Sequence, residues 1–162
     1  LENKKEKIAI AKNGNQVWFI APRFEFVSRT LDGTFPDYQG IIPKKLDAEI
    51  TADKNELMGA VKLVSSLGGG TQEVTISSGE QKKTINVFSR HDHLGENTCA
   101  VSAKIEKELQ EVSFNTKYLL DGLRSLSGKS VLFGTQHENK PAILRSPDDP
   151  SYFYIVMPIL KR

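Results

Sequence analysis

The chain has 162 residues, of which 38% are hydrophobic and 26% are charged, a composition typical of a globular protein that buries a core without disulfides. Its formal net charge of +2, from 22 basic and 20 acidic residues, excludes a protein that holds nucleic acid by bulk positive charge. The single cysteine, Cys99, excludes an internal disulfide and a multi-cysteine zinc site, and it favours a reducing, cytoplasmic location.

Three short segments rich in β-branched and aromatic residues open the chain and predict three strands, at 8–11, 16–21 and 24–31. The Asn-Gly-Asn sequence at 13–15 predicts a tight hairpin between the first two, because these residues tolerate positive φ angles. Three strands are too few to form a core of their own. We therefore expect them to belong to a larger domain, and the chain, which has no initiator methionine, to begin inside a longer gene product.

A connector follows, because residues 32–45 contain two prolines and two glycines and show no periodicity. After it the pattern predicts one strand, one helix and three strands. Asp53 followed by Glu56 is typical of a capping box at a helix start, and the helix runs to about residue 67, where three glycines at 68–70 end it. The apolar face of this helix comprises Leu57, Ala60, Val61, Val64 and Leu67. The four strands around the helix are predicted at 46–51, 73–77, 83–90 and 98–105.

The same order of elements recurs in the second half of the chain. Asn115 is a good N-cap for a helix that ends near residue 126, before Gly128. The apolar stripe of this helix comprises Leu119, Leu120, Leu123 and Leu126. The four accompanying strands are predicted at 110–114, 131–136, 141–145 and 152–159. The sequence therefore predicts a duplicated βαβββ unit of the α+β class, with two helices side by side on one face of antiparallel sheets.

Each predicted helix carries basic residues on the face opposite its apolar stripe. Lys54 and Lys62 share that face on the first helix, and Lys117 and Arg124 share it on the second. Such a face is either an ordinary solvated surface or a surface that meets phosphates, and the residues alone do not separate the two interpretations.

The sequence contains one candidate metal or acid/base cluster, His91-Asp92-His93 with Cys99 nearby. On a strand the two histidines would point to the same face, but no third ligand follows at a conventional spacing, which favours exposed residues of a hairpin turn. The glycines at 68–70 follow a helix instead of introducing one, so they do not form a phosphate-binding loop. We predict no catalytic residue, no metal and no cofactor, and retain a metal-dependent hydrolase that uses His91, Asp92 and His93 as an alternative.

Three motifs in the right order give the chain a resemblance to a known family. They are Leu-Asp-Gly-Thr-Phe-Pro-Asp-Tyr at 31–38 with Ile-Ile-Pro at 41–43, Phe-Asn-x-x-Tyr-Leu-Leu-Asp at 114–121, and Tyr-Ile-Val-Met-Pro-Ile at 154–159. With these motifs the chain resembles the bacterial DNA polymerase III beta subunit family, the sliding clamps, over its whole length. The matched part is the tail of the middle domain and the C-terminal domain.

The resemblance implies the DNA clamp fold and a non-catalytic processivity factor of DNA replication. A clamp subunit pairs with a second copy into a ring that encircles duplex DNA without sequence specificity. Through a hydrophobic peptide groove the ring tethers the DNA polymerase III catalytic subunit, the clamp loader and other clamp-binding proteins. The implied organisation is the last strands of the middle domain at 1–34, a connector at 35–45 and the third clamp domain at 46–162. A stand-alone β-rich interaction module remains a second alternative.

The resemblance also implies roles for particular residues. The subunit interface would include Leu63 and Val64. The DNA-facing residues would be Lys44, Lys45, Lys54, Lys62, Lys117 and Arg124. The peptide groove would be formed by Pro36, Gly40, Ile41, Asn115, Tyr118, Pro141, Val156, Met157, Pro158, Ile159 and Leu160.

Overall fold

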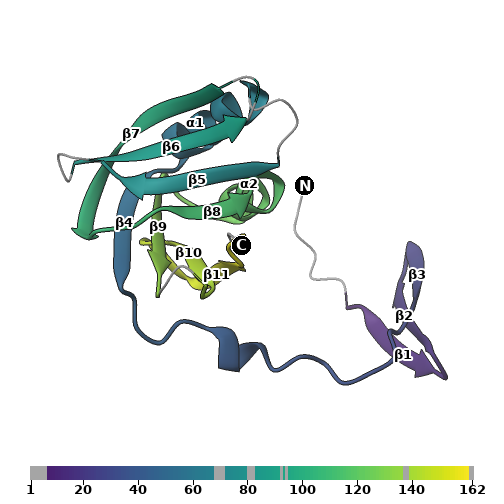
Figure 1. Ribbon diagram of the computed structural model, residues 1–162. Coiled ribbons are helices and arrows are strands. Elements are labelled where there is room, and N and C mark those ends of the chain that lie inside the picture. The colour runs from purple at the N-terminus through teal and green to yellow at the C-terminus, as the bar shows by residue number, and fades with distance from the viewer. Residues whose placement is uncertain are drawn as a thin grey trace. The chain divides into compact units, whose positions relative to one another are not determined.

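The computed structural model describes residues 7–67, 72–79, 83–91, 93, 95–136 and 139–160. The predicted helix-ending glycines at 68–70, and Asp92 of the histidine cluster, lie outside these residues. The chain divides into two compact units, one up to Asp37 and one from Tyr38 onward (Figure 1). The boundaries expected after residues 34 and 45 stay predictions.

The first unit is a three-stranded antiparallel sheet of β1 (Ala9–Asn13), β2 (Gln16–Ala21) and β3 (Phe24–Arg29). Gly14 takes a φ of 57° in the turn between β1 and β2, which confirms the predicted hairpin. No described residue of this unit is fully buried. The sheet therefore presents apolar side chains such as Ile10 and Phe26 to solvent.

The second unit contains the predicted duplication. After a short 3-10 helix, η1 (Tyr38–Ile41), each repeat has one strand, one helix and three strands, in an antiparallel sheet of order β11-β10-β9-β4-β7-β6-β5-β8. The first repeat is β4 (Ala48–Asp53), α1 (Lys54–Leu67), β5 (Glu73–Ser78), β6 (Thr84–His91) and β7 (Gly95–Lys107). The second is β8 (Val112–Asn115), α2 (Thr116–Ser125), β9 (Ser130–Thr135), β10 (Ala142–Ser146) and β11 (Asp149–Val156).

The two helices contact each other, and Figure 1 shows both behind strands β5, β6 and β8. The apolar stripes predicted for them are buried between helices and sheet, together with Phe114 and Phe133, whose rings meet edge to face 5.6 Å apart. Only the side chain of Leu67 in these stripes lies outside the described residues. These contacts confirm the α+β architecture with helices side by side. Neither described helix is long and apolar enough to cross a membrane.

Both helices begin at the predicted caps. The Asp53 carboxylate accepts hydrogen bonds from the amides of Asn55 and Glu56, both 2.9 Å long, and Asn115 Oδ1 accepts two from the first turn of α2. The second half of the predicted capping box is wrong. Glu56 does not bond back to Asp53, because its Oε1 accepts the amide of Ser102 on β7 at 3.1 Å.

A reciprocal pair of backbone hydrogen bonds relates the two repeats. The first amide of α1, at Lys54, donates to the carbonyl of Lys129 after α2, and the first amide of α2, at Thr116, donates to the carbonyl of Gln72 after α1. Both bonds are 2.8 Å long. Each helix therefore finds an acceptor for an otherwise unpaired N-terminal amide in the segment that follows the other helix.

The last strand differs from its predicted bounds. It begins at Asp149 instead of residue 152 and ends at Val156 instead of residue 159. Pro150 is tolerated because β11 is the outer strand of the order above and because its pairing with β10 shifts register between Arg145 and Ser146. Pro158, which has no amide hydrogen, prevents the strand from continuing.

Candidate functional site

The residues Met157–Leu160, here called the terminal segment, run back to the start of the second repeat. The amide of Ile159 donates to the carbonyl of Ser113 on β8 at 2.8 Å, and β8 leads directly into Asn115 and α2. Met157 and Leu160 are 56% and 59% exposed. The fold therefore brings two separate parts of the predicted groove, the terminal segment and the start of α2, to neighbouring positions.

Helix α2 also packs against β11, which adds aromatic side chains to this region. A Cβ atom at Gly122 would overlap the ring of Tyr154, so helix and strand are in close contact. Burial raises the pKa of Tyr154, and the nearby Asp121, Tyr152 and Tyr118 raise it further. Tyr118 and Tyr152 are themselves exposed. We call Tyr118, Tyr152, Met157, Ile159 and Leu160 the apolar surface.

Several residues predicted for the groove have other positions. Pro141, Val156 and Pro158 are buried, so their side chains are not presented to a ligand at the protein surface. The side chain of Asn115 caps α2 through its oxygen and donates through Nδ2 to Gln72 at 3.2 Å. Ile41 is half exposed in η1, which also contains Gly40, whereas Pro36 belongs to the other unit.

The predicted basic residues fall into two groups. Lys44, Lys45, Lys62 and Lys117 are exposed, and exposed Arg124 forms an ion pair with Asp121 at 3.1 Å. Lys54 differs from these residues in its contacts. Its ammonium group is partly buried and donates to the carbonyl of Leu126 at 2.8 Å. There its positive charge interacts favourably with the partial negative charge at the C-terminal end of α2.

The two residues predicted for a subunit interface also differ. Leu63 is 52% exposed on α1, but Val64 is fully buried in the core and its side chain cannot meet another subunit. Sequence analysis missed a second feature beside α1. Residues 95–102 of β7 pair with β6 on one side only, and no described strand pairs with their other side, which is a free sheet edge.

Charged side chains gather where β6 meets that edge strand. The Arg90 guanidinium donates to Glu96 at 2.5 Å and to Glu111 at 3.5 Å, and it lies over the ring of Phe88 at 4.6 Å. The hydrogen bond from Arg90 lowers the pKa of Glu96 from its ordinary value, and the bond to Glu96 is the main cause of the raised pKa of Arg90. These residues place both positive and negative charges beside the free edge.

His91 is the last residue of β6, and His93 lies in a turn. His91 Nδ1 accepts the backbone amide of His93 at 3.2 Å, and the two rings are 6.0 Å apart. Among the residues that the structure describes, which exclude Asp92, no three His, Cys, Asp or Glu side chains gather in a way that could hold a metal ion. The described geometry therefore gives the metal hydrolase alternative no support.

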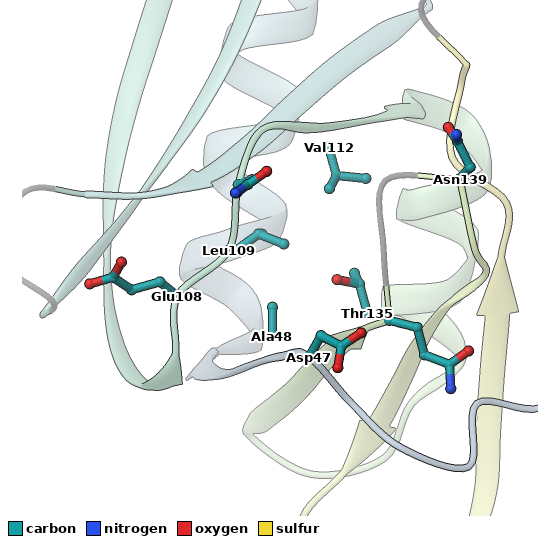
Figure 2. A pocket seen from close by; sticks show the side chains of 9 residues that line it. Asp47, Ala48, Glu108, Leu109, Val112, Thr135 and Asn139 are labelled. Carbon is teal, nitrogen blue, oxygen red and sulfur yellow. The ribbon is translucent and has the colours of Figure 1, made fainter.

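A pocket of about 430 Å³ opens at the end of the sheet where β4 begins and β9 ends (Figure 2). Two carboxylates, at Asp47 and Glu108, line it together with carboxamides, the hydroxyl of Thr135 and apolar side chains. Sequence analysis missed this pocket because its walls come from three separate stretches of the chain, around residues 47–48, 108–112 and 135–139, none of which carries a motif.

Comparison with protein families matches residues 39–160 to the family described as DNA polymerase III beta subunit, C-terminal domain. Among curated proteins, the beta sliding clamp of Bacillus subtilis is 30% identical over 161 residues, which are 98% of this chain and 43% of that protein. The beta sliding clamp of Staphylococcus aureus strain Mu50 is 29% identical over 165 residues, covering 98% of this chain and 42% of that protein. The chain thus spans less than half the length of these relatives.

Solved structures give the same result. The sliding clamp of Bacillus subtilis superposes with a TM-score of 0.84 at 28% identity, covering 100% of this chain and 43% of that one. The DNA polymerase III beta subunit of Thermotoga maritima gives 0.82 at 25% identity, covering 96% and 42%. A sliding clamp from Bartonella birtlesii bound to griselimycin gives 0.84 at 25% identity, covering 95% and 41%.

Proposed function

Because the chain belongs to the DNA polymerase III beta subunit family, matching its C-terminal domain over residues 39–160, we propose that it works as the C-terminal part of a bacterial sliding clamp. The family assignment confirms the resemblance carried by the three sequence motifs. In this role the protein is a non-catalytic processivity factor of DNA replication in the cytoplasm. The observation that carries the proposal is this family match, which spans both βαβββ repeats of the second unit.

The proposed organisation has three parts. Residues 1–34 are the last strands of the middle clamp domain, 35–45 are the connector and 46–162 are the third domain. The exposed apolar side chains of β1 to β3 support the first assignment, because a sheet of three strands buries too little surface to be stable alone. The alignment covers 43% of the Bacillus subtilis clamp, a share that agrees with one complete domain, the third, and part of the middle domain.

The proposed DNA-facing surface lies on the helices and the connector. Lys62 and Lys117 are exposed on α1 and α2, which pack side by side, and Lys44 and Lys45 are exposed before β4. Mobile lysines that meet phosphates loosely suit a ring that slides, because such contacts carry no sequence information. Arg124 joins this set as an exposed residue, whereas Lys54 is left out because its ammonium donates to the carbonyl of Leu126, the residue that follows α2.

The proposed ring interface uses the exposed side of α1 and the free edge of β7. Leu63 supplies an apolar contact, and residues 95–101 offer backbone groups that no described strand pairs with on that side to a strand of a second copy. The Arg90–Glu96 pair beside this edge adds charges that can select the register of the approaching strand. The partner in this contact is a second full-length clamp subunit.

The proposed partner-binding site is the apolar surface. Its exposed aromatic and aliphatic side chains suit short peptides with apolar anchors, and Met157 can adapt to anchors of different shape. The partners are the DNA polymerase III catalytic subunit, the clamp loader and other clamp-binding proteins. The griselimycin complex of the Bartonella birtlesii clamp supports a ligand-accepting surface in this family.

A peptide titration tests the partner-binding site. We expect a fluorescent peptide with leucine and phenylalanine anchors to bind this chain and Met157→Asp to weaken binding about tenfold or more, because a carboxylate would be desolvated against apolar anchors. Leu63→Asp is the matched control, since Leu63 is exposed to the same degree on α1 and should leave peptide affinity unchanged. Equal affinity of Met157→Asp and the parent protein would exclude the apolar surface as the peptide site.

A DNA-retention experiment tests the ring in a full-length clamp subunit that carries this region. We expect the subunit to stay on nicked circular DNA after loading and to slide off when the DNA is linearised. Leu63→Asp should reduce retention by opening the subunit interface, while Met157→Asp should leave retention on loaded circles unchanged. Retention that survives linearisation would indicate ordinary DNA binding and contradict a topological ring.

A further inference from the structure

The turn between β1 and β2 contains the only asparagine of the sequence that a glycine follows. Asn13 is the last residue of β1, and Gly14 begins the loop that Gln16 closes by pairing with Asn13. Gly14 has a φ of 57°, a left-handed conformation in which a residue with a side chain is strained. The geometry of the hairpin therefore places a residue without a side chain directly after Asn13.

Asn13 and Gly14 are both exposed, and neither is tied to a neighbour. Within the described part of the chain, the Asn13 carboxamide makes no hydrogen bond and the Gly14 amide donates to no backbone carbonyl. Nothing lies within 4 Å of the position that a Cβ atom at Gly14 would occupy. The side-chain carbonyl carbon of Asn13 and the backbone nitrogen of Gly14 are therefore open to water and unhindered by other side chains.

Asn15, in the same turn, has a different environment. Its carbonyl accepts the Thr30 amide at 2.8 Å and the Thr30 hydroxyl at 3.2 Å. The next residue, Gln16, carries a side chain and pairs with Arg29 of β3 as well as with Asn13. Asn15 is also exposed, so the two asparagines differ in the residue that follows them and in how firmly that residue is held. This difference makes Asn15 a control inside the same turn.

The sheet around the turn does little to keep Asn13 in its extended conformation. No described residue of β1, β2 or β3 is buried, and a small sheet without a core opens readily. Closure of a ring between the Asn13 side chain and the Gly14 nitrogen requires rotation about the backbone bonds of Asn13. Opening of the hairpin at this end permits that rotation.

We infer that Asn13 is a site of spontaneous deamidation, which converts it to isoaspartate and aspartate. The Gly14 nitrogen loses its proton to base and attacks Cγ of Asn13. The new N–Cγ bond forms, the Cγ–Nδ2 bond breaks, and the side-chain nitrogen takes up a proton and leaves as ammonia. Water then opens the five-membered imide at either of its two carbonyls. The reaction consumes only water, and base accelerates it because the Gly14 amide must be deprotonated.

Isoaspartate at this position weakens the hairpin. When the imide opens at the backbone carbonyl, Gly14 stays attached through Cγ, so the main chain becomes longer by one methylene group. The extra group lies in the residue that pairs with Gln16, where it disturbs the register of β1 and β2. The second unit has a core of its own and should not respond.

Incubation of the whole chain in mildly alkaline buffer, followed by peptide mapping with mass spectrometry, tests this inference. We expect Asn13 to lose its amide at least about tenfold faster than Asn15, which corresponds to a barrier about 1.4 kcal/mol lower. The rate should rise with pH. Asn13→Gln should remove most of the ammonia release, because its ring would need six members. Asn139→Gln, at an exposed position of the second unit, should leave ammonia release unchanged.

A synthetic peptide of residues 9–20 gives the rate of the same sequence without the rest of the chain. A rate at Asn13 of the protein that approaches the rate of the peptide supports the inference. Equal rates at Asn13 and Asn15, or an intact Asn13 after the peptide has reacted, overturn it. Hydrogen exchange of the aged protein should be faster in β1 and β2 and unchanged in β4 and β9. The reaction involves neither DNA nor a clamp-binding peptide, so its outcome is independent of the proposed clamp function.

Discussion

Arg90 is the side chain that organises charge at the end of β6. It donates to Glu96 and Glu111 and covers Phe88, yet both it and Glu96 are about half exposed to solvent. Water and salt screen such pairs, so their contribution to the free energy of unfolding is small. The interaction between Arg90 and Glu96 is therefore better measured through the pKa of the Glu96 carboxyl group than through the free energy of unfolding.

We expect Arg90→Gln to raise the pKa of Glu96 toward its ordinary value, because the largest cause of the lowered pKa is the hydrogen bond from Arg90. A lowered carboxyl pKa stabilises the folded state above the unfolded pKa, and this contribution is lost as the pH falls through the folded pKa. The stability difference between the two proteins should therefore be present at neutral pH and vanish in acid.

NMR titration of the side-chain carboxyl groups gives the measurement. Lys104→Gln is the matched control, because Lys104 lowers the pKa of Glu106 by the same kind of bond and should leave Glu96 unaffected. An unchanged Glu96 titration in Arg90→Gln would show that another group causes the shift.

At the scale of the element, the contact between α2 and β11 depends on the absence of a side chain at Gly122. Alanine would normally stabilise a helix by about 1 kcal/mol relative to glycine. Here its Cβ would overlap the ring of Tyr154 and approach Leu144. We expect Gly122→Ala to lower the free energy of unfolding by about 1 to 2 kcal/mol, since overpacking exceeds the gain in propensity.

Gly59 on α1 is the matched control for this prediction. A Cβ there meets nothing within 4 Å, so Gly59→Ala should stabilise the protein by up to about 1 kcal/mol. Chemical denaturation of both variants measures the two effects. Changes of the same sign would mean that helix propensity, and not contact with β11, decides the outcome at Gly122.

At the scale of the whole molecule, the two units should differ in stability. The second unit has a core that spans both repeats, whereas the first has three strands and no buried residue among those described. We expect the amides of β1 to β3 to exchange with deuterium orders of magnitude faster than those of β4 and β9 in the core sheet. Hydrogen exchange followed by mass spectrometry on the whole chain measures this directly. Equal protection of both units would contradict the assignment of β1 to β3 to a larger domain.

The repeat and its helix caps were predictable because their signals are local. The side chains of Asp53 and Asn115 accept hydrogen bonds from backbone amides no more than three residues away. Hydrophobic periodicity and turn residues mark the helices and strands around them. Features that depend on distant partners were not predictable. Glu56 bonds to a strand 46 residues away, and Val64 is buried because α1 lies against strands that come later in the chain. The pocket beside Thr135 has the same origin, since no single segment contains it.

The reciprocal bonds from the first amides of α1 and α2 have a consequence for the ancestry of the fold. A solitary βαβββ polypeptide would leave that amide without its acceptor and one flank of its helix uncovered. Two identical copies related by a dyad would each supply the missing carbonyl to the other, as Lys129 and Gln72 do here. A gene encoding one half should therefore yield a homodimer, and tandem fusion of such a gene would produce the present covalent arrangement.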